Sequence, residues 1–203
     1  MATHPITSLV AAAAVTLTLG TGLAACSTDA SAPSGSSASA PSAGPAHNQA
    51  DVTFAQDMIE HHAQAIAMSK MAIQRAGSPQ VKNLAARIQA AQQPEMDQMG
   101  SWLHAWNAPV PSTNGPMAGM DHDATGAMPG MMTSDQMRQL KMVPGDKFDQ
   151  MYLRMMIAHH KGAITMARSE LSGGQNTEAR ELAQRIIDTQ QREISEMQAF
   201  PGV

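Results

Sequence analysis

The sequence predicts an all-α protein in which two copies of one helical hairpin form an antiparallel four-helix bundle. Three observations support this prediction. A residue pattern recurs at a constant offset of 98 positions, which carries His61 onto His159. Apolar residues recur at the three- and four-residue steps of a helix, and clusters of Gly, Pro, Ser and Asn separate these periodic stretches.

The composition limits the classes of protein to which the chain can belong. Hydrophobic residues make up 43% of it and aromatic residues only 3%, while 18 methionines stand against 3 phenylalanines, so we expect a soft, methionine-rich core. The net charge of -4 gives no basic surface for nucleic acid. The single cysteine excludes an intrachain disulfide and a cysteine-based zinc site.

Residues 1–25 resemble a bacterial lipoprotein signal peptide, and residues 26–50 are typical of a flexible tether rich in Ser, Ala and Pro. The apolar stretch ends in "LAAC", so we expect Cys26 to become the lipidated first residue of the mature chain. The leading "MATHP" lacks the usual positive charge. An ordinary secretory peptide with a chance cysteine and a buried structural cysteine are the alternatives. The lipoprotein interpretation predicts an extracytoplasmic protein, secreted and anchored to the cell membrane by lipid.

The first repeat is expected at 52–106, at the start of a bundle domain that covers 51–203. Asp51 or Thr53 can cap its first helix. The "GSP" at 77–79 breaks the helical pattern, and a second helix is expected from Pro79 to Trp106, where "NAPVP" follows.

A long crossover at 107–144 is expected to join the two repeats, and the second repeat is expected at 145–200. Within the crossover, "TSDQMRQLKM" is typical of one short capped helix. The "PGD" at 144–146 opens the next bundle helix, and "SGGQN" ends it. Asn176 or Thr177 can cap the last helix, which runs to about Phe200.

Helical spacing places the two "HH" pairs toward the core. His61 shares a stripe with Phe54, Met58, Ala65, Met68 and Ala72, and His159 shares the equivalent stripe with Tyr152, Met156, Ala163 and Met166. The adjacent residues His62 and His160 share a neighbouring isoleucine stripe, whereas Asp57, Glu60, Gln64 and Gln74 fall on the opposite, solvent side.

The second helix of each repeat adds buried polar residues at the same level, Gln92 and Glu95 in the first and Gln190 and Glu193 in the second. A carboxylate inside a bundle needs a partner. One interpretation pairs His61 with Glu95 and His159 with Glu193, to fix the helix register. The other is that imidazoles and thioethers hold a metal ion, with the glutamates and glutamines as supporting residues around the ligands.

Soft thioether ligands combined with imidazole favour copper, especially Cu(I). No Glu is followed by His three residues later, which argues against a carboxylate-bridged di-iron oxidase. No organic cofactor is indicated. The candidate metal ligands are His61, His159, Met58, Met68, Met156 and Met166, with His62 and His160 in a supporting role.

The crossover contains an unusual cluster of methionines in "GPMAGMDHDATGAMPGMM". The candidate ligands of a loop metal site are Met117, Met120, His122, Met128, Met131 and Met132. The alternative is that some of these methionines fold back onto the end of the bundle. Met137 and Met142, on the short helix, are expected to be packing residues.

The two His-His repeats, "MMTSDQM" and "FDQMYLRMMIAHHKGAITMA" resemble an uncharacterised bacterial family of extracytoplasmic, Met/His-rich helical-bundle proteins. The similarity covers about Val52 to Met197. It implies a ferritin-like bundle, and some members are described as periplasmic copper-binding proteins associated with copper resistance. Carried over, it implies copper binding by Met58, His61, His62, Met68, Met156, His159, His160 and Met166.

These observations predict a copper-binding lipoprotein that sequesters copper or passes it on without catalysis. Its expected partners are the metal ion, the membrane through Cys26, and either a second copy of the chain or a copper-handling protein. Two other functions stay open, a structural or partner-binding bundle without metal and a metal-dependent oxidase.

Overall fold

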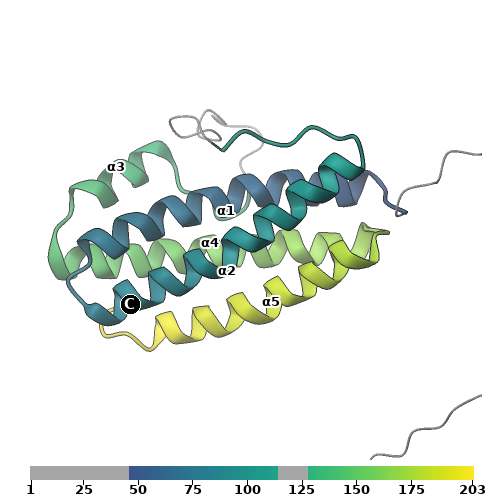
Figure 1. Ribbon diagram of the computed structural model, residues 1–203. Helices are drawn as coiled ribbons and strands as arrows, with labels where there is room; N and C mark the ends of the chain where they lie inside the picture. The colour runs from purple at the N-terminus through teal and green to yellow at the C-terminus, as the bar shows by residue number, and fades with distance from the viewer. Residues whose placement is uncertain (1–45, 114–127) are drawn as a thin grey trace, which may run out of the picture. The chain divides into compact units, whose positions relative to one another are not determined.

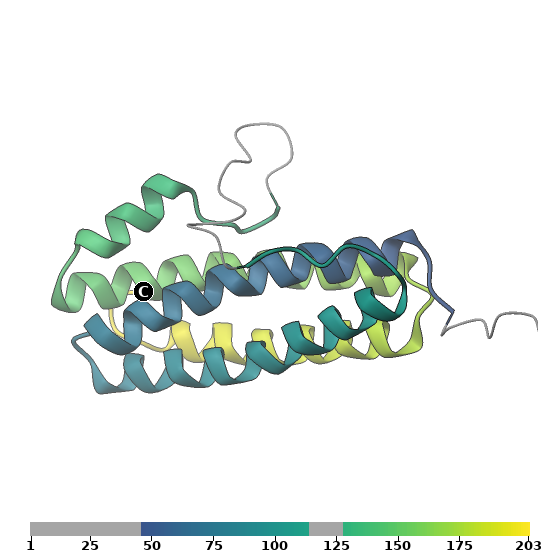
Figure 2. The same cartoon turned by 45° about the horizontal axis from the view of Figure 1, so that its top comes forward.

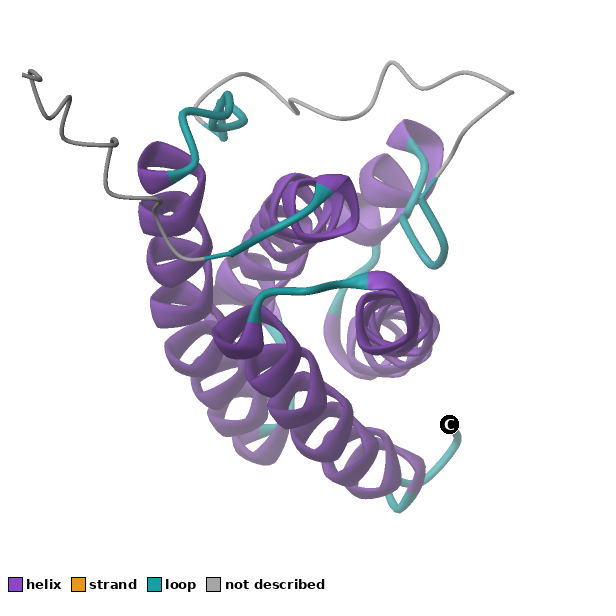
Figure 3. Cartoon of the chain, turned by 90° about the vertical axis from the view of Figure 1, so that its right-hand side faces the viewer, coloured by secondary structure: helices purple, strands orange, loops and turns teal. Residues whose placement is uncertain are grey.

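The computed structural model describes residues 46–113 and 128–203, and these residues form helices and connecting loops without any strand (Figures 1 and 3). The expected signal peptide, Cys26, most of the tether, and Met117, Met120 and His122 lie outside the described residues. The helices are α1 (Gln49–Arg75), α2 (Pro79–Ala105), α3 (Ser134–Met142), α4 (Gly145–Gly173) and α5 (Thr177–Gln198). The predicted all-α fold is confirmed.

The four long helices form the bundle, with α1 against α2, α4 against α5, and α1 against α4. The short helix α3 packs on α4, on the side away from α2 and α5 (Figure 2). None of the helices in the described part of the chain is long and apolar enough to cross a membrane.

The start of α1 is fixed by a capping box that the sequence analysis assigned wrongly. The Asn48 side chain accepts hydrogen bonds from the backbone N–H groups of Ala50 and Asp51, and Asp51 accepts one in return from the backbone of Asn48. The cap is therefore Asn48, and neither Asp51 nor Thr53. Both candidates lie inside the helix, because the reciprocal bonds between Asn48 and Asp51 make the helix start at Gln49.

The other helix starts agree with their sequence signals. Ser78 caps α2 with Pro79 in the first helical position, and Thr133 caps α3 together with Gln136. Of the two candidates for α5, the cap is Asn176, whose side chain accepts a hydrogen bond from the N–H of Ala179. These caps satisfy N–H groups that a helix start leaves without internal partners.

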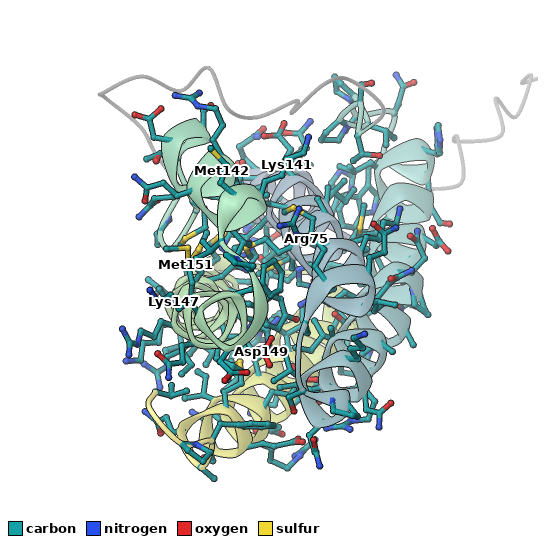
Figure 4. The ribbon with its side chains drawn as sticks, turned by 90° about the vertical axis from the view of Figure 1, so that its left-hand side faces the viewer. Arg75, Lys141, Met142, Lys147, Asp149 and Met151 are labelled. Carbon is teal, nitrogen blue, oxygen red and sulfur yellow. The ribbon has the colours of Figure 1, made fainter. Side chains whose placement is uncertain are left out.

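Two equivalent carboxylates tie the hairpins together. Asp149 of α4 accepts hydrogen bonds from the backbone N–H groups of Gly77 and Ser78, at 2.9 and 2.7 Å. Asp51 of α1 accepts them from Gln175 and Asn176, at 3.0 and 2.9 Å. Each aspartate therefore holds the connection of the other hairpin, and Figure 4 shows Asp149 beside the α1–α2 connection. This reciprocal clasp supports the inference of a duplicated unit.

The buried apolar side chains form two clusters that flank a polar layer. The cluster toward the end of α1 includes Met68, Leu84, Tyr152 and Met156. The cluster toward the start of α1 includes Phe54, Met99, Leu103 and Leu182. The buried polar side chains between the two clusters are His61, His62, Gln92, His159, His160 and Gln190.

The burial of two side chains differs from the prediction. Gln64 was assigned to the solvent face but is 6% exposed, because the chain segment before α3 covers it. Met142, expected to pack, is 83% exposed at the end of α3, beside Lys141 (Figure 4). Met137 is buried, as expected for a packing residue.

Candidate metal centre

Four histidines meet at the middle of the bundle, and all four are fully buried. His61 of α1 and His159 of α4 face each other across the contact between the repeats. Their ring centroids are 3.7 Å apart and the rings are tilted by 39°. The helical repeat therefore brings the two "HH" pairs together in space, although 98 positions separate them in sequence.

Each of the other two histidines pairs with a glutamate of its own hairpin. His62 Nε2 lies 2.7 Å from Glu95 Oε2, and His160 Nε2 lies 2.6 Å from Glu193 Oε2. The predicted pairs His61–Glu95 and His159–Glu193 are therefore wrong. The first residue of each "HH" faces the other repeat, whereas the second faces the adjacent helix of its own hairpin.

The hydrogen-bond partners indicate which ring nitrogen carries a proton in three imidazoles. The carbonyl oxygen of Pro129 lies 3.0 Å from His61 Nε2 and can only accept a hydrogen bond, so that nitrogen carries the proton. The carboxylates of Glu95 and Glu193 assign the proton to Nε2 of His62 and His160 in the same way. The Nδ1 atoms of these three rings are buried and have no hydrogen-bond partner.

The two facing histidines are held neutral by their surroundings. Burial, reinforced by the neighbouring His62, lowers the pKa of His61 to about 3. Burial and then the facing His61 lower the pKa of His159 well below its ordinary value, and the carbonyl of His61 offsets this effect only in part. Neither ring nitrogen of His159 makes a well-formed hydrogen bond. A neutral imidazole retains a lone pair, which is the form that binds a metal ion.

The two glutamines of the layer also have polar atoms without partners. Both amide atoms of Gln92 and the carbonyl oxygen of Gln190 are buried and make no hydrogen bond. Because buried polar groups are nearly always paired, each such atom calls for an explanation. Together with the unpartnered imidazole nitrogens, these atoms make the layer the part of the described residues where a bound ion or polar ligand would satisfy the most buried polar groups.

The four candidate methionines divide into two pairs. Met58 and Met156 are fully buried, each three residues from the first histidine of its own helix, on opposite sides of the layer. Met68 is also fully buried but lies seven residues beyond His61, about 10 Å along the helix axis. Met166 lies equally far from His159 and is partly buried. The thioethers of Met58 and Met156 are therefore the ones within about one helical turn of the imidazoles.

Met99 and Met197 are two further possible ligands, which the sequence pattern alone did not single out. Both are fully buried and follow Glu95 and Glu193 by four residues, so they border the layer as well. Their own offset of 98 was the signal that could have identified them. Each side of the layer thus has one methionine from each hairpin helix, Met58 and Met99 on one side and Met156 and Met197 on the other.

No ready-made cluster of His, Cys, Asp or Glu ligands exists in residues 46–113 and 128–203. No three His, Cys, Asp or Glu side chains there have the arrangement of a metal site. Thioethers are outside that set of residue types, and the tilted contact of His61 with His159 occupies the space between the rings. Binding an ion therefore requires a change in the angle between these rings, with sulfur or amide groups completing the ligand set.

The described part of the methionine-rich crossover packs against the bundle. Met132 is 7% exposed and belongs to the cluster toward the end of α1. Met131 is partly buried, and Met128 lines a surface pocket with Gln56, Asp57 and Glu60. Met132 therefore folds back onto the bundle, as the alternative predicted. It lies on the side of the bundle rather than at its end. The other three candidates of the loop site lie outside the described residues.

Comparisons with known proteins agree with this architecture. Residues 51–201 match the family described as Domain of unknown function (DUF305). A DUF305 protein of Streptomyces coelicolor described as secreted is 33% identical, with a TM-score of 0.64, 73% of this chain covered and 89% of that one. A DUF305 fragment from Deinococcus radiodurans is 31% identical, with a TM-score of 0.65, 76% of this chain covered and 96% of that one.

A third similar structure is that of CopM in its Cu(II)-bound form. It is 33% identical, with a TM-score of 0.61, 73% of this chain covered and 93% of that one. CopM is also known in Cu(I)-bound and Ag-bound forms. A comparison with curated proteins gave no match.

Proposed function

The chain belongs to the DUF305 family, and from this premise we propose that it is an extracytoplasmic copper-binding protein whose ion lies in the buried histidine layer. The observation that supports the proposal most strongly is the set of buried imidazole nitrogens without hydrogen-bond partners, which includes those of the neutral rings of His61 and His159. The similarity to CopM, which binds Cu and Ag, adds support, because this chain has the same fold at 33% identity.

The chemistry of the available donors favours a soft ion. Imidazole nitrogen and thioether sulfur are suited to Cu(I) and to Ag(I), whereas Mg²⁺ and Ca²⁺ require oxygen ligands. His62 and His160 are oriented through Nε2 by Glu95 and Glu193, the arrangement by which a carboxylate sets the tautomer and raises the basicity of a metal-binding histidine. The proposed ligands are therefore Nδ1 of His62 and His160, the rings of His61 and His159, and the sulfurs of Met58 and Met156.

The role of the protein is proposed to be storage or transfer of the ion rather than catalysis. The four histidines of the layer are fully buried between two apolar clusters, which would shield a bound ion from solvent and favours holding it over turning over a substrate. Attachment to the membrane through a lipid on Cys26 is part of the proposal and depends on the sequence signal alone. The similarity to a DUF305 protein described as secreted supports the extracytoplasmic location.

A competition titration tests the proposal. The mature protein is titrated with Cu(I), and separately with Ag(I), against a chromogenic chelator. We expect the double variant His62→Ala/His160→Ala to lose at least about tenfold in affinity, in the range measured for ligand-supporting residues of metal sites. His104→Ala is the matched control, because His104 is exposed on α2. Equal affinity in the double variant and the control would exclude the layer as the site.

A structural bundle without metal is the second candidate, supported by the two His–Glu pairs themselves. In that case the pairs would serve only to hold α1 against α2 and α4 against α5. The unaltered protein would then fail to compete with the chelator for either ion. The double variant would in addition lose stability, which thermal unfolding measures.

A further inference from the structure

The last residues of the crossover, 129–132, lie across α1 and α4 and contact the histidine layer. The carbonyl oxygen of Pro129 accepts a hydrogen bond from His61 Nε2 at 3.0 Å. Three residues later, the backbone of Met132 is bound in both directions by the side chain of Gln64. The amide nitrogen of Gln64 donates to the Met132 carbonyl at 2.9 Å, and the Met132 N–H donates to the Gln64 oxygen at 2.7 Å.

The segment 129–132 can approach α4 only because Gly162 has no side chain. A Cβ atom at position 162 would lie 1.8 Å from the Pro129 oxygen and 2.8 Å from the Gly130 Cα. Gly130 itself has a φ of +79°, and a Cβ there would lie 2.5 Å from the carbonyl oxygen of Ala158. Backbone atoms are the obstacle in each case, so neither position has room for a larger residue.

Gln64 and Gly162 are equivalent positions of the two hairpins, since the offset of 98 carries one onto the other. Gln64 holds the segment with its side chain, and Gly162 admits it by having none. If 129–132 only covered the core, burial of Met132 would suffice and contact with His61 would be unnecessary. The Pro129 carbonyl instead accepts a hydrogen bond from a ring nitrogen of the layer.

We propose that segment 129–132 positions His61 for metal binding, by holding its proton on Nε2 through the Pro129 carbonyl and thereby presenting the Nδ1 lone pair to the layer. The proposal rests on the proposed function for the identity of the bound ion. It makes Pro129 a positioning residue that acts through its backbone, as Glu95 and Glu193 do through side chains for His62 and His160. His159, which has no such partner, is the imidazole free to change its tautomer.

The contact also links the crossover to the buried ion. The hydrogen bond from His61 to Pro129, one of the three that hold segment 129–132, exists only while that ring keeps its Nε2 proton. Docking of 129–132 and coordination through Nδ1 of His61 therefore favour each other, whereas coordination through Nε2 would break the bond to Pro129. The preferred ion is again a soft one that accepts a neutral imidazole, such as Ag(I) or Cu(I).

The test uses Gly162→Ala in the full mature chain, with Gly100→Ala as the matched control. Gly100 lies inside α2 and a Cβ there would meet nothing within 4 Å, so both changes add one methyl group to a helical glycine. Ring ¹⁵N spectra of the histidines report the tautomer, and titration with Ag(I) reports affinity without a change of oxidation state. We expect Gly162→Ala to remove the Nε2–H preference of His61 and to weaken Ag(I) binding about fivefold, the effect of one ordinary hydrogen bond.

Gln64→Ala provides a second, milder variant, because it removes both bonds to Met132 and leaves Gly162 and His61 unchanged. It should shift the same His61 signals by a smaller amount. Unaltered His61 signals in both variants, or a changed tautomer with unchanged Ag(I) affinity, would overturn the inference alone. Failure of the unaltered protein to bind Ag(I) and Cu(I) would overturn the proposed function as well, so the two failures are distinguishable.

Discussion

Corresponding positions of the two hairpins fall into two groups when their contacts are compared. In the first group both copies make the same contact. Asp51 and Asp149 each bind the connection of the opposite hairpin, and both second histidines pair with a glutamate of their own hairpin. In the second group the residue types differ, as in the three pairs Gln64 and Gly162, Ser69 and Ala167, and Ala72 and Glu170.

The difference between the groups follows from what each position touches. Contacts that occur twice hold hairpin to hairpin or helix to helix, so both copies need them. The three differing pairs make contacts that occur once. Gln64 and Gly162 meet the single segment 129–132, and Glu170 meets Asp51 at one end of the bundle only. Substitutions at two equivalent positions should therefore have equal effects where the contact is repeated and unequal effects where the contact occurs once.

The largest effect is expected from the reciprocal clasp. Asp51→Ala and Asp149→Ala should each lower the free energy of unfolding by about 2–4 kcal/mol, because two or more backbone N–H groups lose a charged acceptor. Denaturant unfolding measures both, and the double variant should show nearly the sum of the two losses, since the sites lie at opposite ends of the bundle. The exposed Asp188→Ala is the control. A large loss for one aspartate and none for the other would contradict the equivalence.

A pH-dependent loss of stability is expected at only one of these two ends. Burial, together with Asp51, raises the pKa of Glu170 to about 8. Burial alone would raise the pKa of Asp51 too, but bonds from Asn48, Asn176, Gln175 and Glu170 hold it below its ordinary value. Burial therefore favours the protonated, neutral form of Glu170 in the folded protein.

Because the folded pKa of Glu170 exceeds the unfolded one, the folded state binds more protons between pH 4.5 and about 8, and stability falls as pH rises through this range. Glu170→Gln is neutral at every pH, so no buried charge forms as pH rises and about 1–3 kcal/mol of this decline should disappear. Thermal unfolding at pH 5 and pH 8 compares the two proteins. Equal pH dependence in both would remove Glu170 as its source.

The two His–Glu pairs should contribute equally to metal affinity. Glu95→Gln and Glu193→Gln should each weaken Cu(I) binding about tenfold, because each removes the charge that orients one imidazole. Glu181→Gln, an exposed change on the same helix as Glu193, is the control. A tenfold loss in one variant and none in the other would show that the ion uses one hairpin's pair and leaves the second pair structural.

The smallest effect is expected where a buried hydroxyl pair replaces an apolar pair. Ser69 Oγ lies 3.1 Å from the hydroxyl of Tyr152, whereas the equivalent positions hold Ala167 and Phe54. Ser69→Ala should cost about 1–2 kcal/mol, because it leaves the tyrosine hydroxyl buried without a partner. Adding Tyr152→Phe recreates the apolar pair and should recover most of that loss. Calorimetry of the single and double variants measures it, and a double variant less stable than the single one would contradict the comparison.

The fold could be predicted from the sequence because its signals are local and repeated. The 98-residue offset, the helical stripes and the breaks at Gly77 and Gly174 all depend on near neighbours in the chain. The capping box at Asn48 is local and was missed because Asp51, three residues later, is itself a residue type that caps helices. The bonds of Asp51 to Gln175 and Asn176, which lie 124 and 125 residues away, could not be predicted. Contacts of that separation leave no mark in the local pattern.

Helical spacing predicted which residues of the site face the core, but not which partner each of them contacts. Adjacent residues differ by about 100° around a helix, so both members of each "HH" can face the core. Which one faces the glutamate depends on where α2 and α5 lie, and that is decided by packing. For the same reason Gln64 was assigned to solvent, since nothing near it indicates that 129–132 returns to cover it. Exposure of Met142 reflects the position of α3 at the edge of the bundle.

The reciprocal clasp of Asp51 and Asp149 has a consequence for how such a molecule diversifies. Its contacts are those of an isologous homodimer, in which one surface meets its own copy, except that both copies here are joined in one chain. In a true homodimer every substitution appears twice and must be tolerated at both places. Covalent fusion removes that constraint, so one half can gain a glycine or a buried acid while the other keeps the ancestral geometry.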